Sequence, residues 1–295
     1  MIGVVGESLI DVVKGKELVG GCALNVAVAA SSLGAPVTFY GKVSSDRYGL
    51  MILERLIDNE VLFDPQLCNA DEPTLCIRAV PDEEGKASNI FDYKGTAACS
   101  ITEDELLTAF SNEGNINLVF FGSISLLMEP GCREIVQAIR KIENSPVRFL
   151  DPNIRPSLVS DPEAYRKMIL ELASECELVR VSDGDLNYLY PDIDQAEAER
   201  RLLGICRGSL IVTRGAAGYT WYQKSARSFR IDRPCFGAGT AADTIGRGDT
   251  FDGAVIAWLD QNGYIRNLAG LEEEAVGRIL DYASKAELAN ADDLE

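Results

Sequence analysis

The amino-acid sequence predicts an α/β fold with a doubly wound, mostly parallel central sheet that is flanked by helices. Three observations favour this fold class. Short apolar runs alternate with helical segments beyond residue 100, and these runs lack the polar alternation of a sheet with one face in water. Hydrophobic residues make up 46% of the 295 residues, which is enough for a large core. We therefore expect a single domain over residues 1–295.

The elements of the N-terminal region follow from its apolar runs and from its glycine and proline residues. A first strand region over residues 4–10 ends near Asp11, where a doubly wound sheet opens its cleft. An Ala-rich helix is expected over 24–33, because Gly34 fits the C-cap position and Pro36 follows it. A strand over 37–43 and a helix over 50–57 come next.

The following region predicts a small β-sheet. Two strand-like runs over 75–80 and 88–93 are joined by residues 81–86, which have the chemistry of a turn, so a hairpin with one polar face is expected. Residues 12–19 alternate charged and apolar side chains. Together with 73–95 they are expected to form a sheet that projects from the main body.

Beyond residue 100 the chain alternates between strands and helices. The expected strands are 118–121, 147–150, 178–181 and 210–213, and the expected helices are 103–110, 131–142, 162–173 and 195–205. This alternation is typical of an open parallel sheet, in which ligands bind at the carboxyl ends of the strands.

The charge balance argues against two classes of partner. Acidic residues outnumber basic ones by 46 to 28, which gives a net charge of −18 at pH 7. Such a surface repels phosphate backbones and anionic lipid, so we expect no nucleic-acid partner and no membrane partner. No apolar stretch approaches the roughly 20 residues of a membrane-spanning helix. The N-terminus is apolar but short and has no basic leader, so a cytoplasmic location is expected.

Histidine and cysteine usage limits the chemistry. The sequence has no histidine, which excludes Ser-His-Asp and Cys-His catalysis and His-ligated zinc or iron. A general base must therefore be Asp, Glu, Lys, Tyr or Cys. None of the eight cysteines form a C-x-x-C pair, so we expect reduced thiols rather than disulfides or zinc ligands.

The strongest motif is the segment Asp243–Phe251, which reads D-T-I-G-R-G-D-T-F and leads into an amphipathic helix. Gly246 and Gly248 at the helix entrance let unpaired backbone N–H groups approach a ligand, and with the helix dipole these groups form an anion site. Asp249 in the first turn can accept the proton of a hydroxyl that attacks a phosphate. Taken alone, this motif is more often an ordinary loop whose Asp stabilises a helix N-terminus.

Two further segments place polar groups at the expected cleft. Asp11 and Asn25, with Gly20 and Gly21 between them, offer a carboxylate and an amide as partners for neutral hydroxyls. Residues 151–156, D-P-N-I-R-P, place acid, amide and guanidinium groups after a strand. Each segment also has a purely structural explanation, a turn with a flexible corner in one case and a Pro-bounded loop in the other.

In this order, these segments resemble the PfkB (ribokinase-like) carbohydrate kinase family, and within it the chain is most similar to bacterial fructokinases. The matching segments extend over nearly the whole chain and are 20–25, 33–34, 41–49, 151–155, 213–218 and 243–251. The resemblance implies a ribokinase-like fold in which residues 12–19 and 73–95 form a β lid over the sugar. It also implies an enzyme that transfers the γ-phosphate of ATP to a hydroxyl of a small sugar.

The resemblance assigns roles to the matched positions. Asp249 is the implied catalytic base, and the backbone of Gly246, Arg247 and Gly248 forms the implied anion hole. The implied sugar-binding residues are Asp11, Gly20, Gly21, Asn25, Tyr93, Asn153 and Arg155, of which Arg155 lies near the sugar or the phosphate. The implied nucleotide-binding residues are Ser182, Thr213, Gly215, Gly218 and Asn290.

The implied cofactors are ATP and Mg²⁺, with K⁺ as an additional ion in many members. The family's N-x-x-E motif, which organises Mg²⁺ and phosphates, matches residues 182–185, where Ser182 replaces Asn and Asp185 replaces Glu. The resemblance therefore implies a metal–water role for Asp185. A monovalent cation is implied near Asp243 and Thr244.

Two departures from the family pattern affect the nucleotide side. Arg247 stands where the family usually has Ala, and we expect its side chain to point outward or to face the phosphate. The chain ends soon after Asn290, where relatives usually continue over the adenine, so a more open or less selective nucleotide pocket is expected.

The sugar is expected to be a neutral ketohexose, fructose first. Acidic-sugar relatives such as 2-keto-3-deoxygluconate kinases often carry an Arg where this chain has Tyr93, and a missing bidentate partner disfavours a carboxylate substrate. Lys94 weakens this inference because it can supply a charge. A 2-keto-3-deoxygluconate kinase and a ribokinase of the same family remain alternatives.

The sequence alone leaves three questions open. The altered 182–185 motif and Arg247 leave a non-catalytic sugar- or nucleotide-binding regulator as an alternative, although such a protein has no need for Asp249. A Rossmann dehydrogenase is disfavoured, because no G-x-G-x-x-G follows the first strand. An exposed small sheet is compatible with a homodimer, and the sequence does not decide the oligomeric state.

Overall fold

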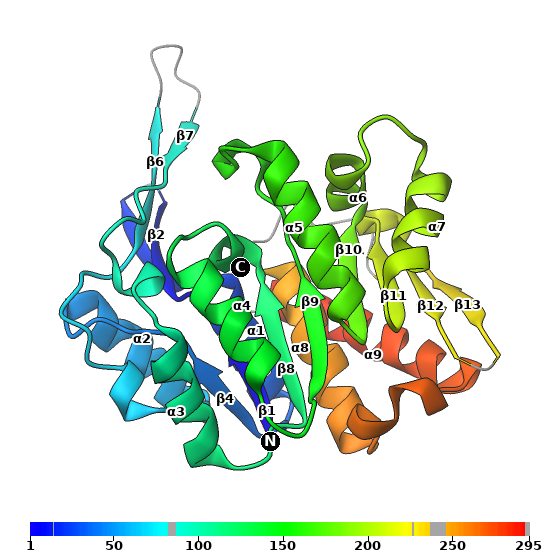
Figure 1. Ribbon diagram of the computed structural model, residues 1–295, viewed down its shortest axis with the longest axis horizontal. Helices are drawn as coiled ribbons and strands as arrows, with labels where there is room; N and C mark the ends of the chain where they lie inside the picture. The colour runs from blue at the N-terminus through cyan, green and yellow to red at the C-terminus, as the bar shows by residue number, and fades with distance from the viewer. Residues whose placement is uncertain (14, 82–86, 226, 237–245, 293–295) are drawn as a thin grey trace.

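A nine-stranded sheet forms the centre of the molecule in the computed structural model (Figure 1). The structure describes residues 1–295 except 14, 82–86, 226, 237–245 and 293–295. From one edge to the other, the strands are β13 (Phe229–Arg233), β12 (Tyr219–Gln223), β11 (Ser209–Thr213), β10 (Leu178–Ser182), β9 (Val147–Asp151), β8 (Leu118–Gly122), β1 (Ile2–Val5), β4 (Val37–Tyr40) and β5 (Leu62–Phe63).

Most of this sheet is parallel, which confirms the predicted fold class. The strands from β11 across to β5 run parallel to one another, and β12 and β13 continue the edge in antiparallel order. The strand order reverses its progression at β1, where β8 lies on one side and β4 on the other. Polar side chains that end neighbouring parallel strands therefore meet at one edge of the sheet.

Helices cover both faces of the sheet. One layer contains α1 (Cys22–Ser32), α2 (Arg47–Asp58), α8 (Arg247–Gln261) and α9 (Glu273–Asp292), and the other contains α3 (Glu103–Glu113), α4 (Gly131–Lys141), α5 (Pro162–Glu175), α6 (Asp183–Leu189) and α7 (Gln195–Ile205). Phe120 packs in the first core and its neighbour Phe121 in the second, because successive strand residues face opposite sides. Burial of one such side chain contributes about 2 to 3 kcal/mol.

The expected small sheet is confirmed and projects from the main body (Figure 1). Its strands are β3 (Lys16–Gly20), β2 (Leu9–Val13), β6 (Cys76–Pro81) and β7 (Ala87–Ile90), in that spatial order. The expectation that Asp11 ends the first strand of the main sheet was wrong, because Asp11 lies within β2 of the small sheet. The boundary was missed because Leu9 and Ile10 are buried and as apolar as the strand before them.

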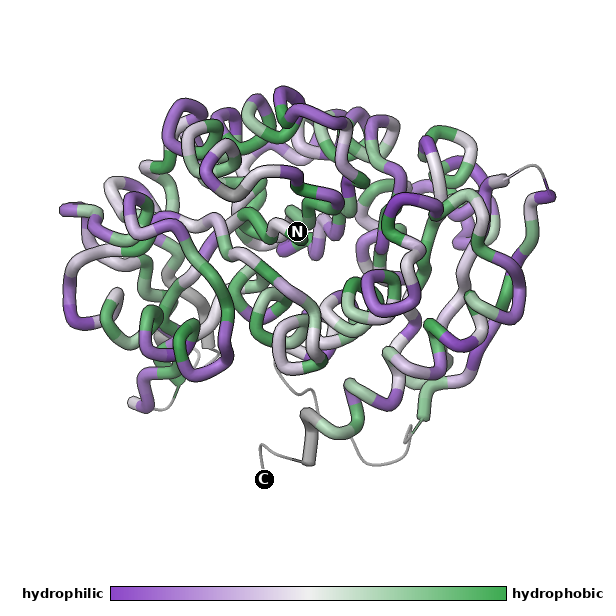
Figure 2. Tube along the Cα trace, turned by 90° about the horizontal axis from the view of Figure 1, so that it is seen from below, coloured by the Kyte–Doolittle hydropathy of each residue, from purple (hydrophilic) through white to green (hydrophobic). Residues whose placement is uncertain are grey.

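Several elements at the ends of the fold were not predicted. Strands β12 and β13 and helices α6 and α9 were left unassigned, although α9 packs closely against α8 and β13. Strand β13 alternates half-buried with exposed residues and carries three charges, so it lacks the apolar run of a central strand. The outer helices carry hydrophilic and hydrophobic residues in turn, as Figure 2 shows, because each has one face on the sheet and one on solvent.

The described residues can be compared with the sequence-based expectations about membrane-spanning helices and about the cysteines. Within the part of the chain that the structure covers, no helix is long and apolar enough to cross a membrane. All eight cysteines are free thiols, as expected, and most of them are buried.

Candidate active site

A cavity of about 500 Å³ opens at the carboxyl ends of the parallel strands. Its walls come from the ends of β1, β8, β9 and β10, from the small sheet, and from the starts of α1 and α8. The sequence-predicted residues that line it are Asp11, Gly21, Asn25, Asn153, Arg155, Ser182, Gly246, Arg247, Gly248 and Asp249. Segments more than 200 residues apart in the chain thus meet in one cavity, as the motif order predicts.

The entrance of α8 presents free backbone donors to this cavity. Gly246 is the N-cap residue in the left-handed conformation, with φ of 89°, and no side chain caps the helix. The first intrahelical bond runs from the Thr250 N–H to the Gly246 carbonyl at 2.9 Å. The N–H groups of Arg247, Gly248 and Asp249 precede it and have no partner within the helix. These donors and the helix dipole form a site for an anion.

Asp249 lies at the same helix start and is almost fully buried, with 6% of its surface exposed. Its Oδ2 atom accepts a hydrogen bond of 2.8 Å from the Asn25 side-chain amide of α1. Burial raises the pKa of the Asp249 carboxyl, and hydrogen bonds from Asn25 and Cys22 oppose that rise. A carboxylate with a raised pKa accepts a proton more readily at neutral pH than an exposed one. The structure therefore places a buried carboxylate, which can accept a proton, beside backbone donors that can bind an anion.

Glu7 supports the start of α1 and was missed in the sequence. It follows β1, lines the cavity and is 1% exposed. Its Oε1 atom accepts the backbone N–H of Cys22 at 2.9 Å, and the Ser125 hydroxyl donates to its Oε2 atom. Burial raises the pKa of Glu7 to about 7. The Glu7 carboxylate thus accepts one of the unpaired backbone N–H groups at the start of α1. The N-cap residue Gly21 has a φ of 110°, a conformation that favours glycine.

The small sheet and the loop after β9 supply the side expected to hold the sugar. Asp11 is half-buried, and burial raises the pKa of its carboxyl while Arg155 lowers it. Gly20 leaves room for this carboxylate, because a Cβ atom there would lie 2.6 Å from Asp11 Oδ2. The Arg155 guanidinium donates to the carbonyl oxygen of Asn153 at 2.9 Å. A carboxylate, an amide and a guanidinium thus share one cavity wall, as the sequence predicts.

A buried charge cluster underlies the anion site and was not predicted. Arg180 of β10 lines the cavity and donates to Asp151 Oδ2 at 2.7 Å and to Thr213 Oγ1 at 3.0 Å. Its guanidinium packs against Gly248, where a Cβ atom would lie 2.9 Å from Arg180 Nη2. Asp252 of α8 is also fully buried, and burial together with Asp151 raises its pKa well above its usual range. No motif marks Arg180, which stands as a lone cation in an apolar strand.

Ser182 and Asp185 begin α6 as a capping box. Asp185 accepts hydrogen bonds of 2.7 Å from the backbone N–H and the hydroxyl of Ser182 and from the backbone N–H of Ile154. Ser182 lines the cavity, whereas Asp185 does not. Burial raises the pKa of Asp185. Its oxygen atoms are therefore largely committed to the protein, and its direct effect on the cavity is to orient Ser182.

Arg247 turns toward α9 rather than outward into solvent. Its Nη2 atom lies 3.7 Å from Glu287 Oε2 and 3.6 Å from the Cys235 sulfur. Glu287 is 5% exposed and also accepts a hydrogen bond from the Tyr219 hydroxyl. Arg247 still lines the cavity, so it places a partly neutralised positive charge on the wall next to the anion site.

Other predicted residues lie near the cavity without lining it. Tyr93 packs beside Phe91, which lines the cavity, with ring centroids 5.2 Å apart. Thr213 contacts Arg180, and the turn with Gly215 and Gly218 borders another cavity of about 430 Å³ whose lining includes Ala217 and Tyr219.

Three predicted positions fall where the structure gives no side chain. Asn290 lies near the end of α9, and its side chain is outside what the structure describes. Asp243 and Thr244 lie outside the described residues. In the part of the chain that is described, no group of three or more acidic or cysteine side chains could hold a metal ion.

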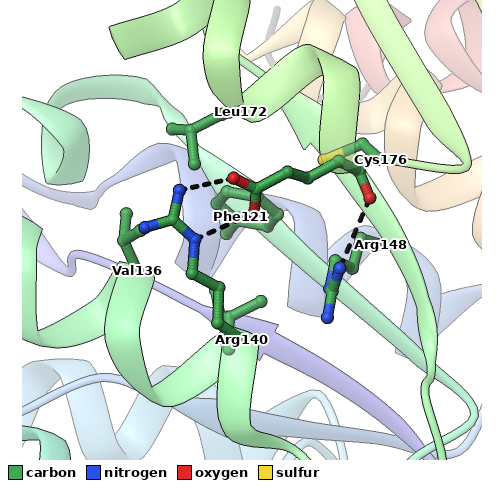
Figure 3. A pocket seen from close by; sticks show the side chains of 8 residues that line it. Phe121, Val136, Arg140, Arg148, Leu172 and Cys176 are labelled. Atoms are coloured by element: carbon green, nitrogen blue, oxygen red, sulfur yellow. Dashed lines mark hydrogen bonds and ion pairs between the residues drawn. The ribbon is translucent and has the colours of Figure 1, made fainter. Parts of the chain in front are cut away.

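A third cavity lies between α4 and α5 on the helical layer away from α8. It measures about 10 Å³, which is room for about one water molecule, and Phe121, Leu172 and Cys176 are among its walls. Figure 3 shows Arg140 pointing across it, and this side chain pairs with Glu175. Its size excludes a small-molecule ligand, so this cavity is not a candidate active site.

One cavity thus contains a helix entrance that can bind an anion, a buried carboxylate and polar side chains that can bind hydroxyl groups, a combination that is typical of enzymes that transfer a phosphoryl group. Comparison with known proteins identifies the class further, because the model of the pfkB family carbohydrate kinases matches residues 2–271. The chain therefore belongs to the pfkB family of carbohydrate kinases, as the motifs indicated.

Individual relatives agree with this family. The fructokinase of Rhizobium leguminosarum bv. trifolii is 31% identical over 287 residues, which cover 92% of this chain and 84% of that protein. Fructokinase-1 of Zea mays is 31% identical over 257 residues, which cover 86% and 77%.

Solved structures show the same fold. The apo fructokinase of Vibrio cholerae O395 superposes with a TM-score of 0.78 at 20% identity, over 99% of this chain and 98% of that chain. A double mutant of that fructokinase, bound to fructose, ADP and a potassium ion, also gives a TM-score of 0.78 at 20% identity, over 98% and 91% of the two chains.

Proposed function

We propose that this protein is an ATP-dependent fructokinase that phosphorylates fructose to fructose 6-phosphate. The observation that carries the proposal is the position of Asp249, a buried carboxylate at the entrance of α8 that lines the same cavity as the expected sugar partners. The curated relatives named fructokinase, from a bacterium and a plant, support fructose as the first substrate. The alternatives are 2-keto-3-deoxygluconate and ribose.

In the proposed reaction, Asp249 takes the proton of the sugar hydroxyl as that oxygen attacks the γ-phosphorus of ATP. The bond from oxygen to phosphorus forms, the bond to the β-phosphate breaks, and ADP leaves. The backbone N–H groups of Arg247, Gly248 and Asp249 bind the equatorial oxygens of the moving phosphoryl group. Asn25 holds the carboxylate of Asp249 in place through its 2.8 Å hydrogen bond.

The sugar is proposed to bind between the small sheet and the loop after β9. Asp11 accepts hydrogen bonds from sugar hydroxyls, Gly20 leaves room for the Asp11 carboxylate, and Gly21 lines the cavity. Asn153 and Arg155 complete this wall, with the guanidinium on the side of the sugar or the phosphate. Tyr93 supports Phe91 at the wall rather than the sugar directly.

The nucleotide is proposed to extend from the anion site past Ser182 toward Thr213, Gly215, Gly218 and Asn290. Arg247 adds positive charge beside its phosphates while Glu287 holds the guanidinium. Mg²⁺ fits best as an ion that arrives with ATP, because phosphate oxygens supply its main ligands and Asp185 has little free capacity. When bound, that ion neutralises phosphate charge. A K⁺ site near Asp243 and Thr244 remains a proposal that rests on the resemblance.

The whole chain is proposed to act as one cytoplasmic domain with the small sheet as a lid over the sugar. Leu9 and Asp11 of β2 and Ile77 of β6 already line the cavity, so an inward movement of this sheet would exclude water. Its edge strands β3 and β7 offer a surface on which a homodimer could form.

The test measures ADP release with Mg-ATP on fructose, 2-keto-3-deoxygluconate and ribose, with the parent protein and with Asp249→Asn. We expect the highest kcat/KM on fructose, and a loss of about 10² to 10⁴ in kcat for the variant because the general base is gone. A higher kcat/KM on either other sugar overturns fructose as the substrate. No turnover on any sugar favours a non-catalytic binding protein.

A further inference from the structure

Arg55 of α2 lies outside the cavity but contacts one of its walls. Its Nη2 atom donates to Asn25 Oδ1 at 3.0 Å, and its Nη1 atom donates to the carbonyl oxygen of Val19 in β3. Asn25 in turn donates to Asp249. Arg55 is therefore linked to the proposed base Asp249 through Asn25 alone. It also connects the small sheet to the start of α1.

These contacts fix the orientation of the Asn25 amide. A carboxylate only accepts hydrogen bonds and a guanidinium only donates them, so the amide nitrogen must face Asp249 and the amide oxygen must face Arg55. A flipped amide would place its oxygen against the carboxylate and its N–H group against the guanidinium. Without Arg55, nothing in these contacts holds the oxygen end of Asn25.

Arg55 also acts on Asp249 through its charge. Burial lowers the pKa of Arg55, and the negative charge of Asp249 opposes that effect. Across the described ranges, Arg55 has no carboxylate within ion-pair distance. Asp249 is therefore the acidic group with the largest effect on the pKa of Arg55. The titratable and charged groups that act on Asp249 are Glu7, Cys22, Arg55, Asp151, Arg180 and Asp252. Three of these six groups are carboxyl groups, which oppose ionisation of Asp249, whereas the cations Arg55 and Arg180 favour its ionised form.

We propose that Arg55 is a positioning residue that holds Asn25 in its working orientation and keeps Asp249 ionised as the pH falls. Its bond to Val19 makes the end of β3 part of the same support. The kinetic part of this inference rests on the proposed kinase function, whereas the coupling between Arg55 and Asp249 does not.

The kinetic test compares Arg55→Met and Arg55→Lys with the parent over a pH series. In Arg55→Met we expect the acid limb of kcat/KM for fructose to move upward by about one pH unit, because an opposite charge near the base is lost. Activity then falls about tenfold on the acid side and much less on the alkaline side. Arg55→Lys restores part of the shift. The exposed Arg133→Met on α4 is the matched control and should keep the parent profile.

A loss of activity that is equal at every pH, with no recovery in Arg55→Lys, overturns the inference, because a merely structural role gives that result. An unchanged profile in a folded Arg55→Met overturns it as well.

A second test does not depend on catalysis. Urea unfolding of the parent, Arg55→Met, Asp249→Asn and the double variant gives the coupling between the two residues. We expect a coupling free energy of about 1.4 kcal/mol at about pH 8, which is the equivalent of the one-unit shift in pKa. At about pH 5 we expect a smaller coupling free energy, because more Asp249 is protonated there. If Arg55→Met does not fold, Arg55→Lys replaces it, with a smaller coupling in the same direction. The absence of coupling at both pH values overturns the inference even in an active enzyme. A pH-dependent coupling in a protein that phosphorylates no sugar supports it and refutes only the proposed function.

Discussion

Glu7→Gln tests how burial sets the protonation of the Glu7 carboxyl group, which lines the cavity. Glu7 is 1% exposed, and burial raises its pKa to about 7 from the ordinary value of 4.5. Between these values the native state binds more protons than the unfolded state, so the free energy of unfolding falls as the pH rises. The full shift corresponds to about 3.4 kcal/mol, of which about 2.5 kcal/mol falls between about pH 5 and pH 8.

Gln has nearly the same shape and stays neutral throughout. Its amide oxygen can accept the Cys22 N–H, and its amide nitrogen can donate to the Ser125 hydroxyl, which is free to rotate. We therefore expect Glu7→Gln to gain about 2.5 kcal/mol relative to the parent on going from about pH 5 to pH 8.

The assay is urea unfolding of both proteins across this range, with exposed Glu54→Gln on α2 as the control. The control should follow the parent at every pH. If the difference in the free energy of unfolding between Glu7→Gln and the parent is the same at every pH, the reasoning is refuted, because Glu7 then has the same pKa in the folded and unfolded states.

The remaining predictions concern the anion site. Gly248→Ala brings a Cβ atom to 2.9 Å from Arg180 Nη2, and Asp151 and Thr213 hold that guanidinium in place. We expect a fall of about tenfold or more in kcat as the helix entrance shifts, with Gly204→Ala, which meets no atom within 4 Å, as an unaffected control. Arg247→Ala removes positive charge from the cavity wall, and we expect the KM for ATP to rise about fivefold while the KM for fructose stays unchanged. An unchanged or lower KM for ATP indicates instead that Arg247 obstructs the nucleotide.

Much of the fold could be predicted because its signals are local. The buried parallel strands are short apolar runs, and the predicted boundaries of β8 to β11 agree with the structure to within one residue. The edge strand β13 lacks such a run, and its place in the sheet depends on pairing with β12 and on packing against α9. Asp11 was assigned to the wrong sheet for a related reason, because sheet membership depends on distant partners such as Ile77.

The candidate site shows the same difference between residues with local sequence signals and residues whose partners are far away in the chain. Asp249, Gly246 and Asn25 were predicted because their motifs read in sequence and because a helix entrance has a known chemistry. Glu7, Arg55 and Arg180 were missed, since each is a lone polar residue whose partner is far away in the chain. Glu7 and Ser125 are 118 residues apart, and no periodicity or spacing reports such a contact.

In the proposed mechanism, Asp249 receives the proton of the sugar hydroxyl at the entrance of α8. The most direct measurement is the single-turnover rate of phosphoryl transfer to fructose in Asp249→Asn, with fructose binding measured separately by calorimetry. We expect the rate to fall by about 10² to 10⁴ while the Kd for fructose changes by less than about threefold, because Asn keeps the shape but cannot take the proton. A rate within about tenfold of the parent contradicts the claim, since general-base catalysis by this carboxylate is worth more than that.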